Sequence, residues 1–295
     1  MTAAAGEQPG PKPKPRRKLT VPGVRAHKGA TPLVMVALYD FSTARLAEAA
    51  GVDMILVGDS LGMVLLGHAS TVPVTLDDIV RHTQAVVRGA PKTHVVADLP
   101  FLTYHIDDGR TVENAGRLIQ EGGADAVKLE GGRVVARRVR ALTDAGIPVC
   151  GHVGLTPQSA GALGGFKVQG ATEAGARHVL ADAEAVAEAG AYALVLEAIP
   201  AELGALVTER VDLPTIGIGA GPDCDGQVLL AHDLLGLEER FAPRFVKRYA
   251  DLAGITRSAF AAYAEEVRQR TFPAPEHTYA AEPEVVRSAV RTPGE

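Results

Sequence analysis

Four acidic residues of this chain stand at the ends of short apolar runs. They are Asp59, Asp98, Glu130 and Glu197. If the runs are neighbouring strands, these carboxylates converge, and at about 4 Å two such charges repel by about 4 kcal/mol at an effective dielectric of about 20. A divalent cation removes that repulsion, and Mg²⁺ prefers carboxylate oxygens while keeping positions for water or substrate. The sequence therefore predicts a Mg²⁺ site that is open to a substrate.

One lysine lies inside an apolar run. Lys128 occupies the middle of Ala-Val-Lys-Leu-Glu at 126–130, where an unpaired ammonium is unfavourable. Residues two apart on a strand share a face, so Lys128 and Glu130 point to the same side. A cation and carboxylates beside a metal suit a 2-oxo acid, which chelates the metal through its carboxylate and keto oxygens.

Several other polar residues allow a structural as well as a functional interpretation. His152 is either a packed core histidine or a residue that binds substrate, and we favour the second. Asp40 precedes a helical pattern and is expected to cap it. Cys150 is expected to be a buried packing residue. The run Gly217-Ile-Gly-Ala-Gly221 either cradles a phosphate or permits close backbone approach.

These residues are positioned by eight short runs that are apolar at consecutive positions, as in strands covered on both faces of a parallel sheet. The runs are Leu33–Leu38, Met54–Val57, His94–Ala97, Ala126–Leu129, Pro148–Gly151, Ala193–Leu196, Thr215–Ile218 and Val228–Ala231. Helical patterns separate most of them, at Ser42–Ala50, Leu76–Arg88, Thr111–Glu121, Arg133–Ala145 and Arg177–Ala189.

Eight alternating strand and helix units predict an α/β fold, a closed (βα)8 TIM-type barrel with extra helices at its N- and C-terminal ends. The competing fold, an open doubly wound sheet, normally has a glycine-rich fingerprint after its first strand. Tyr39-Asp-Phe-Ser42 stands there instead. In a barrel the active site lies at the carboxyl ends of the strands, where the four acidic residues are.

Composition excludes several classes of protein. The 295 residues are 46% hydrophobic and 22% charged, which excludes a disordered or collagen-like chain. No apolar run approaches the roughly 20 residues of a membrane span. The net charge of −5 does not suggest a nucleic-acid partner. Two cysteines and a start unlike a signal peptide lead us to expect a cytoplasmic protein.

The chain divides into three parts by composition. Residues 1–18 alternate proline with lysine and arginine, which predicts a disordered basic tail. Residues 19–279 are predicted to form a single catalytic barrel domain, and residues 280–295 a loose C-terminal tail.

The sequence resembles the ketopantoate hydroxymethyltransferase (3-methyl-2-oxobutanoate hydroxymethyltransferase) family over roughly residues 20–279. The matching stretches, in the family's order, are Leu56–Met63, Val72–Thr75, Val87–Pro91, Ala97–Phe101, Val127–Gly132, Cys150–Ser159, Gly164–Gly170, Leu194–Glu197 and Ile216–Gly221. Several of these are long and unusual, so a chance match is implausible.

The resemblance implies transfer of a hydroxymethyl unit from 5,10-methylenetetrahydrofolate to 3-methyl-2-oxobutanoate, giving 2-dehydropantoate for pantothenate and coenzyme A. The metal ligands that it implies are Asp59, Asp98 and Glu130. The positions that it implies for the oxo acid are Asp59, Ser60, Asp98 and Lys128. It further implies Glu197 as proton acceptor and a homodecameric assembly.

The expected mechanism is a Mg²⁺-stabilised enolate. Glu197 removes the proton at C3, Lys128 adds positive charge beside the developing anion, and Ser60 and His152 orient the ligands. The enolate then attacks the one-carbon unit. Two alternatives remain: another Mg²⁺-dependent barrel enzyme on 2-oxo acids, such as a carbon–carbon lyase that needs no folate, and a non-catalytic binding barrel. The retained charged residues argue against the second.

Overall fold

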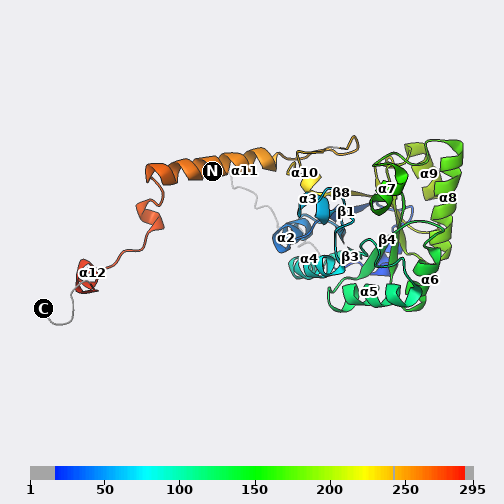
Figure 1. Ribbon diagram of the computed structural model, residues 1–295, viewed down its shortest axis with the longest axis horizontal. Coiled ribbons are helices and arrows are strands. Elements are labelled where there is room, and N and C mark those ends of the chain that lie inside the picture. Colours follow the sequence, from blue (N-terminus) through cyan, green and yellow to red (C-terminus); the bar gives the residue numbers. More distant parts are fainter. Residues whose placement is uncertain (1–16, 242, 290–295) are drawn as a thin grey trace, which may run out of the picture.

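Eight parallel strands form a closed barrel in the computed structural model, which describes residues 17–241 and 243–289 (Figure 1). The strands are β1 (Leu33–Ala37), β2 (Met54–Val57), β3 (His94–Asp98), β4 (Ala126–Glu130), β5 (Val149–Gly154), β6 (Ala193–Glu197), β7 (Thr215–Ile218) and β8 (Gly226–Leu230). Each strand pairs with the next, and β8 closes on β1. The predicted (βα)8 barrel is confirmed, and the open sheet is excluded.

The helices connect successive strands or extend the barrel at its ends. Those between strands are α2 (Phe41–Ala49), α3 (Leu61–Val64), α4 (Leu76–Gly89), α5 (Asp108–Gln120), α6 (Ala136–Asp144), η1 (Pro157–Ser159), α7 (Ala160–Leu163), α8 (Glu173–Glu188) and α9 (Ala201–Arg210). Those at the ends are α1 (Val21–Arg25), α10 (Ala231–Leu234), α11 (Leu252–Gln269), η2 (Pro275–His277) and α12 (Pro283–Ala289).

Capping residues decide where several helices begin. Asp40 caps α2 by accepting a hydrogen bond from a backbone N–H of its first turn, as predicted. The predicted starts of α5 at Thr111 and of α8 at Arg177 are wrong, because Asp107 and Thr172 accept backbone hydrogen bonds and begin these helices earlier. Helix α6 is shorter at both ends than the predicted 133–145.

The last strand also differs from its prediction. The sequence pattern placed it at Val228–Ala231, whereas β8 begins at Gly226 and Ala231 already starts α10. A Cβ at Gly226 would lie 2.7 Å from the Leu33 carbonyl oxygen on β1. The glycine therefore permits the close approach of β8 to β1 that closes the barrel, although glycine normally indicates the end of a strand.

Two apolar layers hold the barrel together. The interior is filled by small and medium side chains, among them Ala126, Cys150 and Val96, and Val24 of α1 joins this cluster. The outward-facing side chains of the strands pack against the surrounding helices in a second, larger cluster. The apolar runs are thus buried on both faces, which is why they lack polar alternation.

The C-terminal segment leaves the barrel. Helix α11 projects away from it, and α12 lies farther out (Figure 1). Exposed apolar side chains on α11 include Ile255, Phe260 and Tyr263. On β1, Val34 is 51% exposed, so the outer face of the strands where the barrel closes is incompletely covered.

Two further predictions concern the ends of the chain. Most of the predicted disordered tail, residues 1–16, lies outside the described residues, and α12 falls within the stretch predicted to be loose, with exposed side chains.

None of the described helices combines the length and the apolar character needed to cross a bilayer.

Candidate active site

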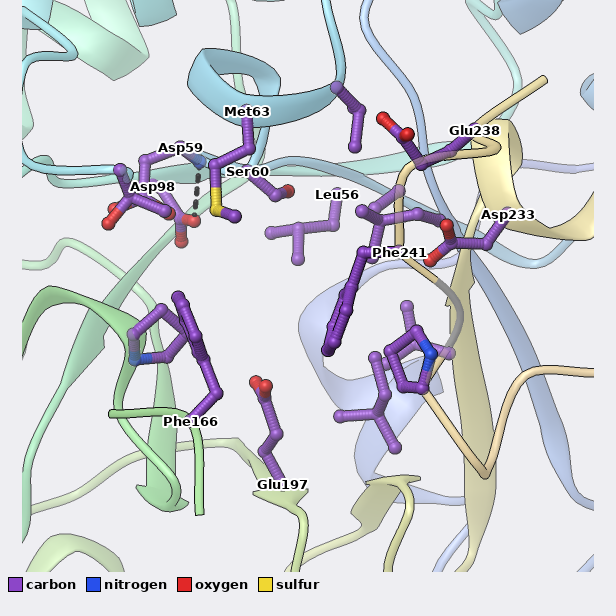
Figure 2. Close-up of a pocket in the computed structure, with 18 of the residues that line it drawn as sticks. Leu56, Asp59, Ser60, Met63, Asp98, Phe166, Glu197, Asp233, Glu238 and Phe241 are labelled. Atoms are coloured by element: carbon purple, nitrogen blue, oxygen red, sulfur yellow. Dashed lines mark hydrogen bonds between the residues drawn. The ribbon is translucent and has the colours of Figure 1, made fainter. Parts of the chain in front are cut away.

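A cavity of about 330 Å³ opens at the carboxyl ends of the barrel strands. Every site residue predicted from the sequence lines it: Asp59, Ser60, Asp98, Lys128, Glu130, His152 and Glu197. Figure 2 shows Asp59 and Asp98 at one side and Glu197 pointing into the space between the walls. The predicted convergence of four carboxylates from four strands is therefore present, and His152 of β5 lies beside them.

Strand register places the charged residues of β3, β4 and β5 side by side. Asp98 is the register partner of Lys128, and Glu130 is the partner of His152. Lys128 Nζ lies 2.8 Å from Asp98 Oδ1 and 3.9 Å from Glu130 Oε1. All of these side chains are almost completely buried. The lysine inside an apolar strand is thus paired on both sides, as its burial demands.

The turn after β2 brings Asp59 against Asp98. The backbone N–H of Asp59 donates to Asp98 Oδ2 at 3.0 Å. A Cβ at Gly58 would lie 2.9 Å from Ser60 Oγ and 3.3 Å from Asp98 Oδ2. A larger residue would press on both side chains, so the glycine favours this approach. Ser60 is held by the hydroxyl of Tyr39 at 2.8 Å, so its hydroxyl has a fixed position at the cavity wall.

Gln158, which sequence reasoning missed, connects the carboxylates. Its Nε2 donates to Asp59 Oδ2 at 2.8 Å and to the Leu99 carbonyl at 3.0 Å, and its backbone N–H donates to Glu130 Oε2 at 3.0 Å. The Tyr104 hydroxyl donates to Gln158 Oε1 at 2.6 Å. The sequence did offer one signal for Gln158. It follows His152 by a few residues and belongs to the matching stretch Cys150–Ser159.

Burial and mutual repulsion disturb the carboxylates. Burial, followed by the neighbouring charges of Asp98 and Glu130, raises the pKa of Asp59 well above its usual range. Burial also raises the pKa of Asp98, although Lys128 opposes the shift. Burial lowers the pKa of Lys128, but the charges of the surrounding carboxylates have the larger effect. On balance the pKa is raised, so the ammonium stays charged. Burial and crowding thus disfavour simultaneous ionisation of these carboxyl groups, a cost that a further cation would remove.

His152 bridges two carboxylates. Its Nδ1 lies 3.5 Å from Glu130 Oε1, and its Nε2 lies 3.1 Å from Glu197 Oε2. Burial and Lys128 lower the pKa of His152, but the hydrogen bonds to Glu130 and Glu197 outweigh them and raise it to about 9. Lys128 Nζ also lies 3.2 Å from His152 Nδ1, so the contact of Nε2 with Glu197 is the one that positions the carboxylate at the cavity. His152 is almost completely buried and also lines the cavity, so its role in binding substrate stays a prediction.

The donor set fits a hard divalent cation. Four buried or nearly buried carboxylates face two basic side chains, Lys128 and His152. Carboxylate oxygens are the ligands that Mg²⁺ prefers. Within the described residues no three acidic, histidine or cysteine side chains already stand at metal-ligand spacing, and Asp98 contacts the ammonium of Lys128 instead.

The remaining candidates have structural roles. Cys150 is fully buried in the interior cluster of the barrel, where burial raises the pKa of its thiol to about 12, and it packs as predicted. In the glycine run after β7, Gly219 has a φ of 67°, and a Cβ there would lie 2.6 Å from the ring of Phe245. These glycines permit close packing at the barrel mouth, the second of the two interpretations given above.

Comparison with known proteins identifies the family. The family model for ketopantoate hydroxymethyltransferase matches residues 18–275. The chain belongs to the ketopantoate hydroxymethyltransferase family. A curated relative from Moorella thermoacetica, named 3-methyl-2-oxobutanoate hydroxymethyltransferase, is 58% identical over 90% of this chain and 98% of its own length. The predicted resemblance is confirmed, as is the prediction that the chain is a transferase of this hydroxymethyltransferase family.

Solved structures of more distant proteins share the fold. A phosphoenolpyruvate phosphomutase from Streptomyces platensis subsp. rosaceus superposes with a TM-score of 0.58 at 19% identity, covering 91% of this chain and 94% of that one. A phosphonopyruvate hydrolase in complex with oxalate and Mg²⁺ gives a TM-score of 0.57 at 14% identity, covering 90% and 93%. At these identities the likeness of the two solved structures to this chain concerns the barrel fold alone.

Proposed function

We propose that this chain transfers a hydroxymethyl unit from 5,10-methylenetetrahydrofolate to 3-methyl-2-oxobutanoate, giving 2-dehydropantoate for pantothenate and coenzyme A synthesis. One observation carries the proposal. A buried ammonium, that of Lys128, lies among carboxylates on the wall of a cavity into which Glu197 points. This arrangement matches a small substrate that carries a carboxylate, a keto group and an acidic C–H bond beside it.

The oxo acid would be held by charge and hydrogen bonding. Lys128 supplies positive charge for its oxygens, and Ser60, fixed by Tyr39, offers a hydroxyl beside them. The residues that would hold Mg²⁺ are Asp59, Asp98 and Glu130. When bound, Mg²⁺ would supply Lewis-acid polarisation of the keto group. The phosphonopyruvate hydrolase that shares the barrel fold was solved with oxalate and Mg²⁺, and this supports the binding of a small carboxylate compound together with a metal.

Glu197 is the proposed proton acceptor. Its carboxylate is 16% exposed, points into the cavity, and is held by His152 Nε2 at 3.1 Å. Loss of the C3 proton to Glu197 leaves an electron pair that forms the bond to the one-carbon unit as the first of its two N–C bonds to the folate breaks. Water then displaces the second folate nitrogen and supplies the hydroxyl group of the product. The two folate nitrogens take up the proton held by Glu197 and one proton from water, which gives tetrahydrofolate.

Assembly and location are also proposals. The catalytic unit is taken as residues 19–279. The exposed apolar residues of α11 and the incompletely covered outer face at Val34 support association between copies of the chain, and the family resemblance suggests a homodecamer. The unpaired, buried Cys150 and Cys224 are consistent with a reducing compartment such as the cytoplasm. We propose no nucleic-acid or membrane partner.

The deciding experiment measures product formation from 3-methyl-2-oxobutanoate and methylenetetrahydrofolate, with Mg²⁺ and with chelator. We expect 2-dehydropantoate only when all components are present. Exchange of the C3 hydrogen in deuterated water, followed by NMR, is expected to need Mg²⁺ but no folate. Exchange at full rate in chelator would contradict the metal assignment. Turnover of an oxo acid without folate would favour a carbon–carbon lyase instead.

A further inference from the structure

Asp233 lies in the same cavity as the charged residues described above and has no role in the chemistry proposed so far. It belongs to α10 and is only 8% exposed, yet it contributes to the cavity wall. Its carboxylate makes no hydrogen bond or ion pair with any of the residues that the structure describes. Figure 2 shows it pointing into the cavity from the side opposite Asp59 and Asp98.

The neighbouring acidic residue, Glu238, is already paired. Arg240 donates to Glu238 Oε2 at 2.6 Å and to Oε1 at 3.0 Å, and Arg240 also donates to the Met63 carbonyl at 2.6 Å. Burial and the charge of Glu238 raise the pKa of Asp233 to about 6, so at neutral pH it is ionised. Asp233 is therefore the carboxylate at this end whose oxygens are available to a ligand.

The walls near Asp233 are aromatic. Figure 2 shows Phe241 beside Asp233 and Phe166 across the cavity, with Glu197 between the two rings. Both rings are substantially exposed, Phe166 at 45% and Phe241 at 58%, and they offer faces on which a flat ring system can stack. A cavity of about 330 Å³ is in the range of roughly 300–1,000 Å³ that holds drug-sized ligands, so it has space beyond a small oxo acid.

We propose that Asp233 recognises the pterin ring of the folate co-substrate. The 2-amino-4-oxopyrimidine edge of a pterin presents an amino group and a ring N–H side by side, and two carboxylate oxygens accept such a pair of donors. The oxo acid has no N–H donor and cannot satisfy Asp233. The pterin then stacks against Phe241 or Phe166, with its one-carbon unit directed towards Glu197. This inference rests on the proposed function.

The test compares Asp233→Asn with the wild type in two measurements. The affinity of Asp233→Asn for tetrahydrofolate, measured by calorimetry, should fall on the order of 10- to 100-fold. The charged carboxylate acceptor is lost, and the new side-chain NH2 group faces the ligand's own N–H donors. Folate-independent exchange of the C3 hydrogen should persist, which shows that the variant is folded. Asp144→Asn, an exposed residue on α6, is the matched control and should bind tetrahydrofolate normally. Unaltered binding by Asp233→Asn would overturn the inference.

A second measurement varies the ligand. The wild type should bind a tetrahydrofolate analogue that lacks the 2-amino group more weakly than tetrahydrofolate, and Asp233→Asn should not show this preference. Equal affinity of the wild type for both compounds, or no affinity for either, overturns the assignment of Asp233. Failure of the proposed function has a different signature, because the wild type would then neither exchange the C3 hydrogen nor form 2-dehydropantoate.

Discussion

Gln158 offers the sharpest test of how the site is organised. Replacing it by leucine keeps the side chain's approximate size but removes three hydrogen bonds: those from Nε2 to Asp59 and Leu99, and that from Tyr104 to Oε1. The backbone bond to Glu130 stays. An unsatisfied buried polar group lowers stability by about 1–3 kcal/mol. Because Tyr104 still contacts the Glu130 backbone, we expect a total loss of about 3 kcal/mol.

The same substitution acts on metal binding. The hydrogen bond from Gln158 is among the interactions that lower the pKa of Asp59, so its loss favours the protonated form, which binds no cation. Residues that orient metal ligands typically contribute about 10–100-fold to metal affinity or activity. In Gln158→Leu we therefore expect the Mg²⁺ concentration for half-maximal C3 exchange to rise by that factor.

Two controls make the result decisive. Gln84→Leu removes one exposed side-chain hydrogen bond on α4 and should change neither the unfolding free energy nor the Mg²⁺ titration appreciably. Gln158→Glu places a fifth carboxyl group in the site, beside Asp59, so the folded-state pKa of the new glutamate should be raised. The stability of this variant relative to the wild type should therefore be best in acid and fall as pH rises. An unchanged Mg²⁺ titration and unfolding curve in Gln158→Leu would refute the reasoning.

Three further predictions follow from other parts of the structure. Glu197→Gln should reduce turnover by about 10²–10⁴-fold with the Mg²⁺ titration unaltered, and normal turnover would exclude Glu197 as the base. Burial raises the pKa of Asp225, but hydrogen bonds from Gly29 and Thr215 and the ammonium of Lys28 outweigh it and lower the pKa. The free energy of unfolding of Asp225→Asn should therefore be about 1–3 kcal/mol lower than that of the wild type near neutrality. Denaturant titrations should show this difference shrink as pH falls below about 4. A difference that stays constant with pH would contradict this. Removal of residues 252–295 should reduce the number of chains per particle, obtained by light scattering from the measured mass and the mass of one chain, and an unaltered number would argue against α11 as an interface.

The fold could be predicted from sequence because burial on both faces leaves a local signature. Strands such as Met54–Val57 are apolar throughout, and their carboxyl ends must meet at one mouth once the barrel closes. The error at β8 has the opposite cause. Gly226 has no side chain to contribute to an apolar pattern, and its function in closing the barrel depends on Leu33, far away in the sequence.

The site was predictable only where it follows from strand geometry. Lys128 and Glu130 lie on a strand, and their spacing determines which way they point. Gln158, Tyr104 and Asp233 come from segments after the strands, and hydrophobic periodicity does not determine the path of such segments. The contacts of Gln158 with Asp59 and Glu130 cross from one barrel loop to another, so only the folded chain reveals them.

The chemistry of the cavity depends on the register of β4 more than on any single charge. Side chains alternate between the two faces of a strand, so a slip by one residue would turn Lys128 outward against the apolar helices and bring Val127 and Leu129 into the cavity. Ala126, below Lys128 on the same face, packs in the barrel interior with Val96 and Cys150. The outward-facing Val127 and Leu129 are buried in the outer cluster. The apolar residues on both faces of β4 therefore fix its register, and with it the contact of Lys128 with the carboxylates.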